Sequence, residues 1–238
     1  MKVAVVGPGK MGREVEAVLH ERGHEPVMVK NGDPFPAGCT VGIDFTRGEA
    51  VVENVKKALT ARARYVVGTT GWTDRTDEVR RLVEVAGGGL VHAANFSVGV
   101  NLFYRIVQEA ARVLAPFADY DPYIVERHHR QKKDAPSGTA KALAAILEAS
   151  GGARRKATTS LSGALKDDEF LVTAVRAGGI VGEHTVGFDS GGDEILLEHR
   201  ARSRRGFALG AVLAAEWIAS RTGFFAFDAV LADLGKRD

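Results

Sequence analysis

A chain of 238 residues can bury a sizeable core, and its length alone allows one large domain or two smaller ones. The formal net charge of +2 is too small to indicate nucleic acid as a partner. Cys39 is the single cysteine, which excludes an intramolecular disulfide. The sequence shows neither a secretory signal nor a run of about 18 apolar residues. We therefore expect a cytoplasmic protein with no membrane partner.

The first 95 residues alternate between short apolar runs and amphipathic segments. Continuous apolar runs are typical of buried parallel strands, whereas a period of 3.6 residues is typical of helices. We expect strands at 2–7, 26–30, 41–46, 64–71 and 89–95, and helices at 11–23, 49–61 and 74–86. This alternation predicts an α/β fold with a Rossmann-type, doubly wound parallel sheet that binds ligands at the C-terminal ends of its strands.

The pattern changes in the second half of the chain. Consecutive strand-like runs separated by glycine turns predict a second α+β domain with a mixed, mostly antiparallel sheet. We expect a helix at 99–114, a strand at 122–128, a helix at 138–150, a polar loop at 151–163, strands at 170–178, 180–190 and 193–203, a final helix at 206–220 and a short tail.

A glycine-rich loop connects the first expected strand to the first helix. Its sequence is Gly7-Pro8-Gly9-Lys10-Met11-Gly12, which has the spacing G-x-G-x-x-G. In a dinucleotide site the first glycine permits a tight turn, the second lets the pyrophosphate approach the backbone, and the third lets the helix pack on the strand. The strand-turn-helix context favours a dinucleotide site over a glycine-rich turn without a ligand.

The second expected strand ends in Lys30 and Asn31, with Asp33 close behind. An acid at this place accepts hydrogen bonds from the ribose hydroxyls of NAD, whereas a cation suits a 2′-phosphate. Lys30 therefore favours NADPH, with NADH also accepted, although a solvated lysine at a strand end remains the alternative.

Two further loops follow the fourth and fifth strands. They contain Gly68-Thr69-Thr70 and Ala93-Ala94-Asn95-Phe96. Small hydroxyl and amide side chains at this sheet edge can contact a nicotinamide or a ribose without blocking it. Simple turn chemistry is the alternative explanation.

The segment "ERHHRQKKDAPSGT" at 126–139 combines histidines, lysines and a helix start. Ser137 is a plausible N-cap, and the N–H groups of Gly138, Thr139 and Ala140 would form an anion site. With a histidine as proton donor and a cation from Lys132 or Lys133, this segment suits a carboxylate substrate. From residue types alone, a solvated basic loop that caps a helix is equally consistent. A zinc site of His128, His129, His92 and Cys39 has no supporting ligand spacing, so no metal is expected.

The same segment resembles the signature of the bacterial dihydrodipicolinate reductases, also called 4-hydroxy-tetrahydrodipicolinate reductases. The likeness extends in order through "GPGKMG", "IDFT", "VVGTTGW", "ANFSVGVN", "RAGGIVGEHTVGF" and "RSRRGFALGAV", and covers nearly the whole chain. Gln131 replaces a third histidine that many members have, and Lys30 replaces the acid that some members have. The second change leaves the cofactor preference open.

The resemblance implies a role for each matching residue. His128 is the expected catalytic acid/base and Lys132 the proton donor. His129 and the helix start at Ser137, Gly138 and Thr139 are expected to bind the dicarboxylate substrate. The expected cofactor residues are Gly7 to Gly12, Gly68 to Thr70 and Ala93 to Phe96. Lys30 is added to them from its place at the end of the second strand, not from the resemblance.

The resemblance also implies reduction of a cyclic unsaturated acid by hydride transfer in lysine and diaminopimelate biosynthesis, by a homotetramer whose second-domain sheets associate. Residues 1–99 and 206–238 are the expected dinucleotide-binding domain, and residues 100–205 the expected substrate-binding and oligomerisation domain. Two alternatives stay open, namely another nicotinamide-dependent enzyme of imines or amino acids, such as an aspartate dehydrogenase, and a non-catalytic redox sensor. The segment "RARSRR" at 200–205 is the sensor's only candidate output surface.

Overall fold

The computed structural model describes residues 1–30, 32–150 and 155–236. Asn31, positions 151–154 of the expected polar loop and the last two residues of the tail lie outside the described residues. The chain divides into two compact units, one formed by Met1–Val98 and Arg204–Asp238 and the other by Gly99–Ser203. No helix among the described residues combines the length and the apolar character that a membrane span requires.

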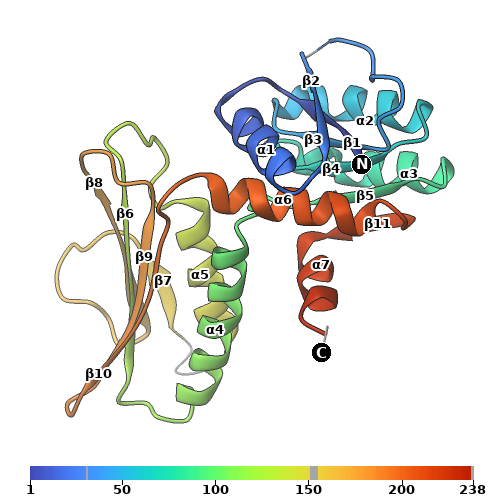
Figure 1. The fold of residues 1–238 in the computed structure, drawn as a ribbon. Coiled ribbons are helices and arrows are strands. Elements are labelled where there is room, and N and C mark those ends of the chain that lie inside the picture. Colours follow the sequence, from blue (N-terminus) through green and yellow to red (C-terminus); the bar gives the residue numbers. More distant parts are fainter. Residues whose placement is uncertain (31, 151–154, 237–238) are drawn as a thin grey trace. The chain divides into compact units, whose positions relative to one another are not determined.

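The first unit contains a parallel sheet with the strand order β11-β5-β4-β3-β1-β2 (Figure 1). Because β2 lies on one side of β1 and β3 on the other, the direction of winding reverses between β1 and β3. Ligands of open parallel sheets bind beyond the carboxyl ends of the strands at this place. The strands are β1 (Lys2–Val6), β2 (Glu25–Val29), β3 (Val41–Asp44), β4 (Arg64–Val67), β5 (Gly89–His92) and β11 (Gly223–Ala226).

Helices cover both faces of this sheet, which confirms the doubly wound fold. In β1, Val3 and Val5 face one apolar cluster while Ala4 and Val6 face the other, as the two-residue period of a strand requires. The first cluster includes residues of α1 (Lys10–Glu21), α6 (Arg205–Ile218) and α7 (Phe227–Leu234). The second includes residues of α2 (Val51–Thr60) and α3 (Thr76–Val85), which follow the short 3-10 helices η1 (Gly48–Ala50) and η2 (Thr73–Arg75).

The tail corrects one expectation from the sequence. Residues 223–234 are not a short tail but a sixth strand of the sheet, β11, followed by α7. β11 pairs in parallel with β5, and Phe227 is buried in the core. β11 is as short as β3, β4 and β5, but it is an edge strand close to the end of the chain, and only its pairing with β5 reveals it.

The second unit contains a mixed sheet with the strand order β10-β9-β6-β8-β7. β9 is antiparallel to both β6 and β10, whereas β8 is parallel to both β6 and β7. β7 lies within the segment that was expected to be a polar loop. Its three residues pair only with β8 and carry no hydrophobic pattern, so the sequence does not mark them as a strand. The strands are β6 (Asp121–His128), β7 (Lys156–Thr158), β8 (Glu169–Arg176), β9 (Glu183–Asp189) and β10 (Glu194–Arg200).

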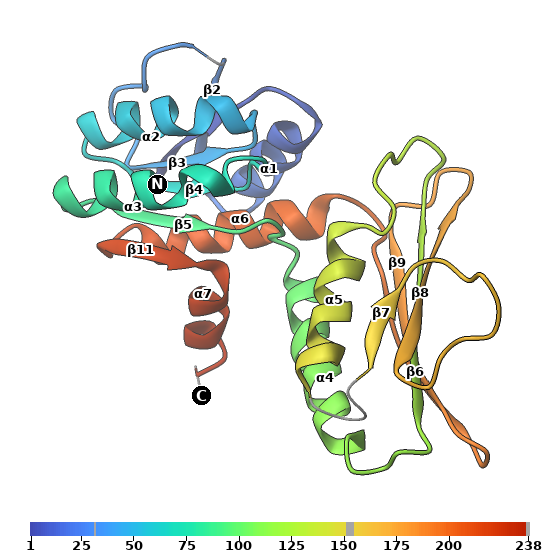
Figure 2. The same ribbon diagram turned by 180° about the vertical axis from the view of Figure 1, so that it is seen from behind.

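One face of this second sheet is covered by α4 (Val98–Leu114) and α5 (Gly138–Ala149), as Figures 1 and 2 show. The core between them includes Phe103, Leu143 and Ile124. On β6 the side chains alternate, so that Ile124, Glu126 and His128 are buried while their neighbours are half-exposed. No helix of the described part of this unit covers the other face (Figure 2).

Candidate active site

The glycine loop has the geometry of a dinucleotide cradle. Gly7 has a φ of +101°, and a Cβ there would lie 2.9 Å from the carbonyl oxygen of Phe45. A Cβ on Gly12 would lie 2.0 Å from the carbonyl oxygen of Gly7, so helix α1 approaches the loop too closely for any side chain. A Cβ on Gly9, the N-cap of α1, would meet no atom within 4 Å. The exposed backbone at Gly9 therefore has open space before it, as a bound pyrophosphate needs.

A buried carboxylate that the sequence analysis missed supports the neighbouring loops. Asp44, at the end of β3, has no exposed surface. Its Oδ1 accepts hydrogen bonds from Thr46 N (2.8 Å), Thr46 Oγ1 (2.7 Å) and Thr69 Oγ1 (2.9 Å), and its Oδ2 accepts from Asn54 Nδ2 (3.0 Å) and Tyr65 OH (3.1 Å). Burial, followed by the charge of Asp44, raises the pKa of Tyr65 well above its usual value, so this phenol stays a donor. Asp44 thus ties the loop after β3 to the loop after β4.

The loops after β4 and β5 place the remaining predicted cofactor residues at the same sheet edge. A Cβ on Gly68 would lie 2.2 Å from the ring of Phe45, so only glycine fits. Thr69 is buried with its hydroxyl committed to Asp44, whereas Thr70 is exposed. In the β5 loop Ala94 is exposed, but Phe96 is buried in the core of the first unit, 4.8 Å from the ring of Phe227. Only the backbone of Phe96 could contact a cofactor.

Beyond β2 the chain makes a turn that brings an acid back to Lys30. The Lys30 side chain is exposed, and its backbone N–H donates to Asp33 Oδ2 at 3.2 Å. The Asp33 N–H donates in return to the carbonyl oxygen of Lys30 at 3.2 Å. Lys57 of α2 donates to the carbonyl oxygens of Gly32 and Asp33, which holds the turn in place. A cation and an anion therefore both lie at this end of β2.

In the second unit, the end of β6 carries the predicted catalytic histidine beside a buried acid. Glu126 is fully buried, and its Oε1 accepts from Arg176 Nη2 and from Ser137 N, both at 2.8 Å. Nδ1 of His128 lies 3.0 Å from Glu126 Oε2, and a Cβ on Gly182 would lie 3.1 Å from His128 Nε2. Although burial alone would raise the pKa of Glu126, the hydrogen bonds from Arg176 and Ser137 lower it below its usual value. Neither Glu126 nor Arg176 is among the site residues predicted from the sequence.

Helix α5 begins at the predicted cap. The Ser137 hydroxyl accepts from Ala140 N at 3.2 Å and lies 3.3 Å from His184 Nε2. The expected anion site therefore needs a correction, because the Ala140 N–H is occupied by Ser137, and Ser137 itself is buried. The exposed Gly138, where a Cβ would meet nothing within 4 Å, leaves the first turn of α5 accessible to an anion.

Lys132 and two imidazoles complete the cluster. Lys132 Nζ lies 2.8 Å from Asp134 Oδ1, and the Asp134 carbonyl accepts from Arg176. The rings of His128 and His184 make an edge contact at 5.2 Å. Burial lowers the pKa of His128; Glu126 opposes this shift, whereas Lys132 and Arg176 add to it. Burial lowers the pKa of His184 to about 4, so His184 is neutral at neutral pH.

Glu126, His128 and His184 could also be considered as metal ligands, because one ligand atom of each lies within 4.8 Å of the others. The Arg176 guanidinium on the same carboxylate disfavours a second cation there. The zinc set considered from the sequence does not correspond to this group, since His92 and Cys39 belong to the first unit.

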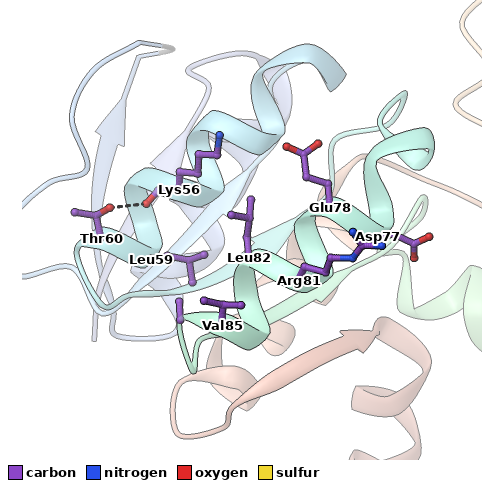
Figure 3. A pocket seen from close by; sticks show the side chains of 9 residues that line it. Lys56, Leu59, Thr60, Asp77, Glu78, Arg81, Leu82 and Val85 are labelled. Carbon is purple, nitrogen blue, oxygen red and sulfur yellow. Dashed lines mark hydrogen bonds between the residues drawn. The ribbon is translucent and has the colours of Figure 1, made fainter.

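A cavity in the first unit lies away from these residues. It is a groove between α2 and α3 with a volume of about 760 Å³. Figure 3 shows its lining, which includes Leu59, Leu82, Val85 and a rim of charged side chains. It lies along the helices and contains none of the residues at the carboxyl ends of the strands. We therefore assign the chemistry to the strand ends rather than to this groove. All predicted cofactor residues belong to the first unit, and all predicted catalytic and substrate residues to the second.

Comparison with known families gives two matches that together span most of the chain. The family described as dihydrodipicolinate reductase, N-terminus, matches residues 24–96, and the one described as dihydrodipicolinate reductase, C-terminus, matches residues 99–231. A 4-hydroxy-tetrahydrodipicolinate reductase of Christiangramia forsetii is 37% identical over 246 residues, which cover 99% of this chain and 100% of the relative. The enzyme of the same name from Archaeoglobus fulgidus is 43% identical over 258 residues, covering 96% and 98%.

Solved structures agree with these sequence matches. A dipicolinate-bound dihydrodipicolinate reductase from Paenisporosarcina sp. TG-14 superposes with a TM-score of 0.76 at 25% identity, covering 96% of this chain and 98% of that one. An amine dehydrogenase from Mycobacterium smegmatis has a TM-score of 0.57 at 11% identity, with coverages of 96% and 95%. The second likeness concerns the fold alone.

Proposed function

The chain belongs to the dihydrodipicolinate reductase family, and we propose how its residues perform that family's reaction. It is an oxidoreductase that reduces 4-hydroxy-tetrahydrodipicolinate to tetrahydrodipicolinate with a nicotinamide cofactor, a step of lysine and diaminopimelate biosynthesis. The observation that carries the assignment of residues is the cluster of His128, Lys132 and the start of α5 at the end of β6.

In this proposal the first unit binds the cofactor. The residues fit a dinucleotide, because side chains are excluded at Gly7 and Gly12 while open space lies before Gly9. The pyrophosphate would lie at the start of α1, where backbone N–H groups and the helix dipole favour an anion. Thr70 and the backbone of the Ala93–Phe96 loop would border the nicotinamide half. The bound cofactor supplies a hydride.

We infer a modest preference for NADPH over NADH. The exposed ammonium of Lys30 favours a 2′-phosphate, whereas the carboxylate of Asp33, turned back to Lys30, favours the free hydroxyls of NADH. Because the two charges oppose each other and both are solvated, neither cofactor is strongly excluded.

The second unit binds the substrate and handles the protons. One carboxylate of the substrate lies at the first turn of α5, near Gly138 and Thr139, where the N-terminal end of the helix dipole attracts it. The cations of Lys132 and Arg176 both contact Asp134 in the loop before α5, and His129 belongs to the same loop, so this segment favours a dianionic ligand. The dipicolinate bound to the structural relative is a ligand of this chemistry.

Proton transfer in the proposed mechanism depends on His128 and Lys132. Water leaves the hydroxylated ring of the substrate, a hydride adds to ring C4, and negative charge develops towards the ring nitrogen. A proton is then added at the neighbouring carbon, so that one hydride and one proton are consumed for each water released. A positioned acid is typically worth about 10²–10⁴-fold in rate.

We also propose a cytoplasmic homotetramer formed through the second sheet. Its open face carries Val125, Leu171, Val175 and Leu196, of which the last two are 40% and 53% exposed. The half-exposed Tyr123 on the same face donates to Glu194 at 2.5 Å. A sheet face of this size without a helical layer is typical of a subunit contact.

A coupled assay tests the function. A synthase generates the unstable substrate in place, this protein is added, and oxidation of NADPH or NADH is followed by absorbance. The account predicts oxidation that depends on the synthase product and is absent with the imine of aspartate. Oxidation of NADPH or NADH by that imine, or reduction of NADP⁺ or NAD⁺ by aspartate, would favour an aspartate dehydrogenase. DNA binding without turnover would favour a redox sensor.

A further inference from the structure

Glu126 is a buried carboxylate, and only one of its two oxygens has a hydrogen-bond partner among the described residues. It lies on β6 two residues before His128, so both side chains point to the same, helix-covered face. A buried carboxylate is costly unless its oxygens are paired. Its position thus calls for a partner at each oxygen.

The two oxygens differ in what they contact. Oε1 accepts from Arg176 Nη2 and from Ser137 N, which fixes the carboxylate against β8 and the start of α5. Oε2 has no hydrogen-bond partner among the described residues, and neither has His128 Nδ1. These two unpartnered, buried atoms lie 3.0 Å apart. Catalytic hydrogen bonds are often poorly aligned without substrate and become linear when it binds.

We propose that Glu126 is a positioning residue for the reaction, in which its Oε2 accepts the Nδ1 proton of His128 and thereby presents Nε2 as the atom that exchanges a proton with the substrate. The inference rests on the proposed function of His128 as acid/base. The same arrangement of carboxylate and imidazole fixes the histidine tautomer in serine proteases. Gly182 leaves room beside Nε2, since a Cβ there would lie 3.1 Å from it.

His184 is the other imidazole close to Oε2, and its contacts leave that oxygen to His128. His184 Nε2 is 3.7 Å from Oε2 and 3.3 Å from the Ser137 hydroxyl. That hydroxyl accepts the Ala140 N–H with one lone pair, and it is placed to donate its own proton to His184 Nε2. A nitrogen that accepts this proton has none to donate to Glu126.

The charged groups around His128 set how strongly it holds its proton. Arg176 on β8 and Lys132 in the following loop disfavour the imidazolium, whereas Glu126 and Asp134 favour it. Glu126 is the fully buried one of the two acids, and it follows that removing its charge weakens the imidazolium most.

Glu126→Gln tests the proposal with little change in shape. The amide oxygen stays with the two donors, Arg176 and Ser137, so the amide NH₂ faces Nδ1 of His128. Nδ1 must then accept, which forces the proton of the neutral ring onto Nε2. We expect kcat to fall about 10²–10⁴-fold, with the KM values for substrate and NADPH changed less than about threefold. Glu126→Asp keeps the charge at a longer distance and should recover part of this loss.

Nitrogen-15 NMR of histidine-labelled protein supplies a readout that a merely structural role would not move. His128 signals are assigned by their loss in His128→Gln. The proposal predicts that neutral His128 carries its proton on Nδ1 in the wild type and on Nε2 in Glu126→Gln, while His184→Gln leaves the wild-type tautomer unchanged. An Nε2–H tautomer in the wild type overturns the proposal, and this measurement needs no variant of Glu126 to fold.

Activity data separate this inference from the assignment on which it rests. If His128→Gln is as active as the wild type, the proposed function of His128 fails, whatever Glu126 does. If His128→Gln is inactive but Glu126→Gln retains full kcat, only the role of Glu126 fails. Loss of activity in both, with the tautomer change in Glu126→Gln, supports both.

Discussion

Removing the Asp44 carboxylate should destabilise the first unit by an amount that its hydrogen bonds determine. In Asp44→Ala the buried Asn54 amide and Tyr65 hydroxyl lose their acceptor. An unsatisfied buried donor costs about 1–3 kcal/mol, so the two together, with the small cavity, should lower the free energy of unfolding by about 3–6 kcal/mol. Asp44→Asn keeps Oδ1 for the contacts with Thr46 and Thr69, but its NH₂ replaces the oxygen that accepts from Asn54 and Tyr65. Because the Tyr65 hydroxyl can turn and accept, the Asn54 amide is the main group left without an acceptor, and we expect a cost of about 1–3 kcal/mol.

Tryptophan fluorescence during urea unfolding measures this effect in the right unit. Both tryptophans of the chain, Trp72 and Trp217, lie in the first unit, and Trp72 Nε1 donates to the Thr69 carbonyl at 2.8 Å. Affinity for NADPH should fall along with stability, because the loops after β3 and β4 lose their common support. The exposed Asp74→Ala serves as control and should change stability by less than about 0.5 kcal/mol. An unfolding midpoint of Asp44→Ala equal to that of the wild type would refute the reasoning.

Three further predictions concern the cofactor, the assembly and pH. The wild type should prefer NADPH over NADH by about tenfold in kcat/KM. Lys30→Asp should erase or reverse this preference, and Asp33→Asn should raise it. An unchanged ratio in both variants would show that the turn of Lys30 and Asp33 does not select the cofactor. Light scattering should give a tetramer that Leu196→Glu breaks and Val85→Glu, at a residue 90% exposed in the first unit, does not; a monodisperse wild-type monomer would contradict the proposed interface. Because the pKa of His184 is about 4 when folded and 6.5 in its ordinary state, the unfolded chain binds the extra proton between these values, so stability should fall by up to about 3 kcal/mol from pH 6.5 to 4. Circular dichroism should show a smaller fall in His184→Gln, and an equal fall would assign the acid sensitivity to other groups.

The parts of the fold that were predictable carry a local signal. The apolar strands and periodic helices of the first 95 residues were identified because each contains at least one full period of its pattern. The glycine spacing and the cap at Ser137 were predictable for the same reason, since turn geometry and capping act over three or four residues. The three residues of β7 include the polar Lys156 and Thr158 and give no such signal. The apolar run of β11 is as long as β3, but nothing in the sequence separates it from the tail.

The buried carboxylates could not be assigned because their partners are distant in the sequence. Glu126 is paired with Arg176, fifty residues away, and Asp44 with Tyr65, twenty-one residues away. One signal was available for Glu126, because the two-residue period of β6 puts it on the same face as Ile124. For Ser137 the residue type predicted the cap, but it did not reveal that the hydroxyl would occupy the Ala140 N–H.

The central claim is that His128 and Lys132 act on the chemical step, and single-turnover kinetics combined with cofactor titration test it most directly. His128→Ala and Lys132→Ala are mixed with saturating NADPH and synthase-generated substrate, with the exposed Lys133→Ala as the matched comparison. We predict that the rate of the first turnover falls by about 10²-fold or more in the first two variants and by less than about threefold in the third, while the Kd for NADPH stays within about twofold in all. First-turnover rates close to the wild type in both His128→Ala and Lys132→Ala would contradict the account.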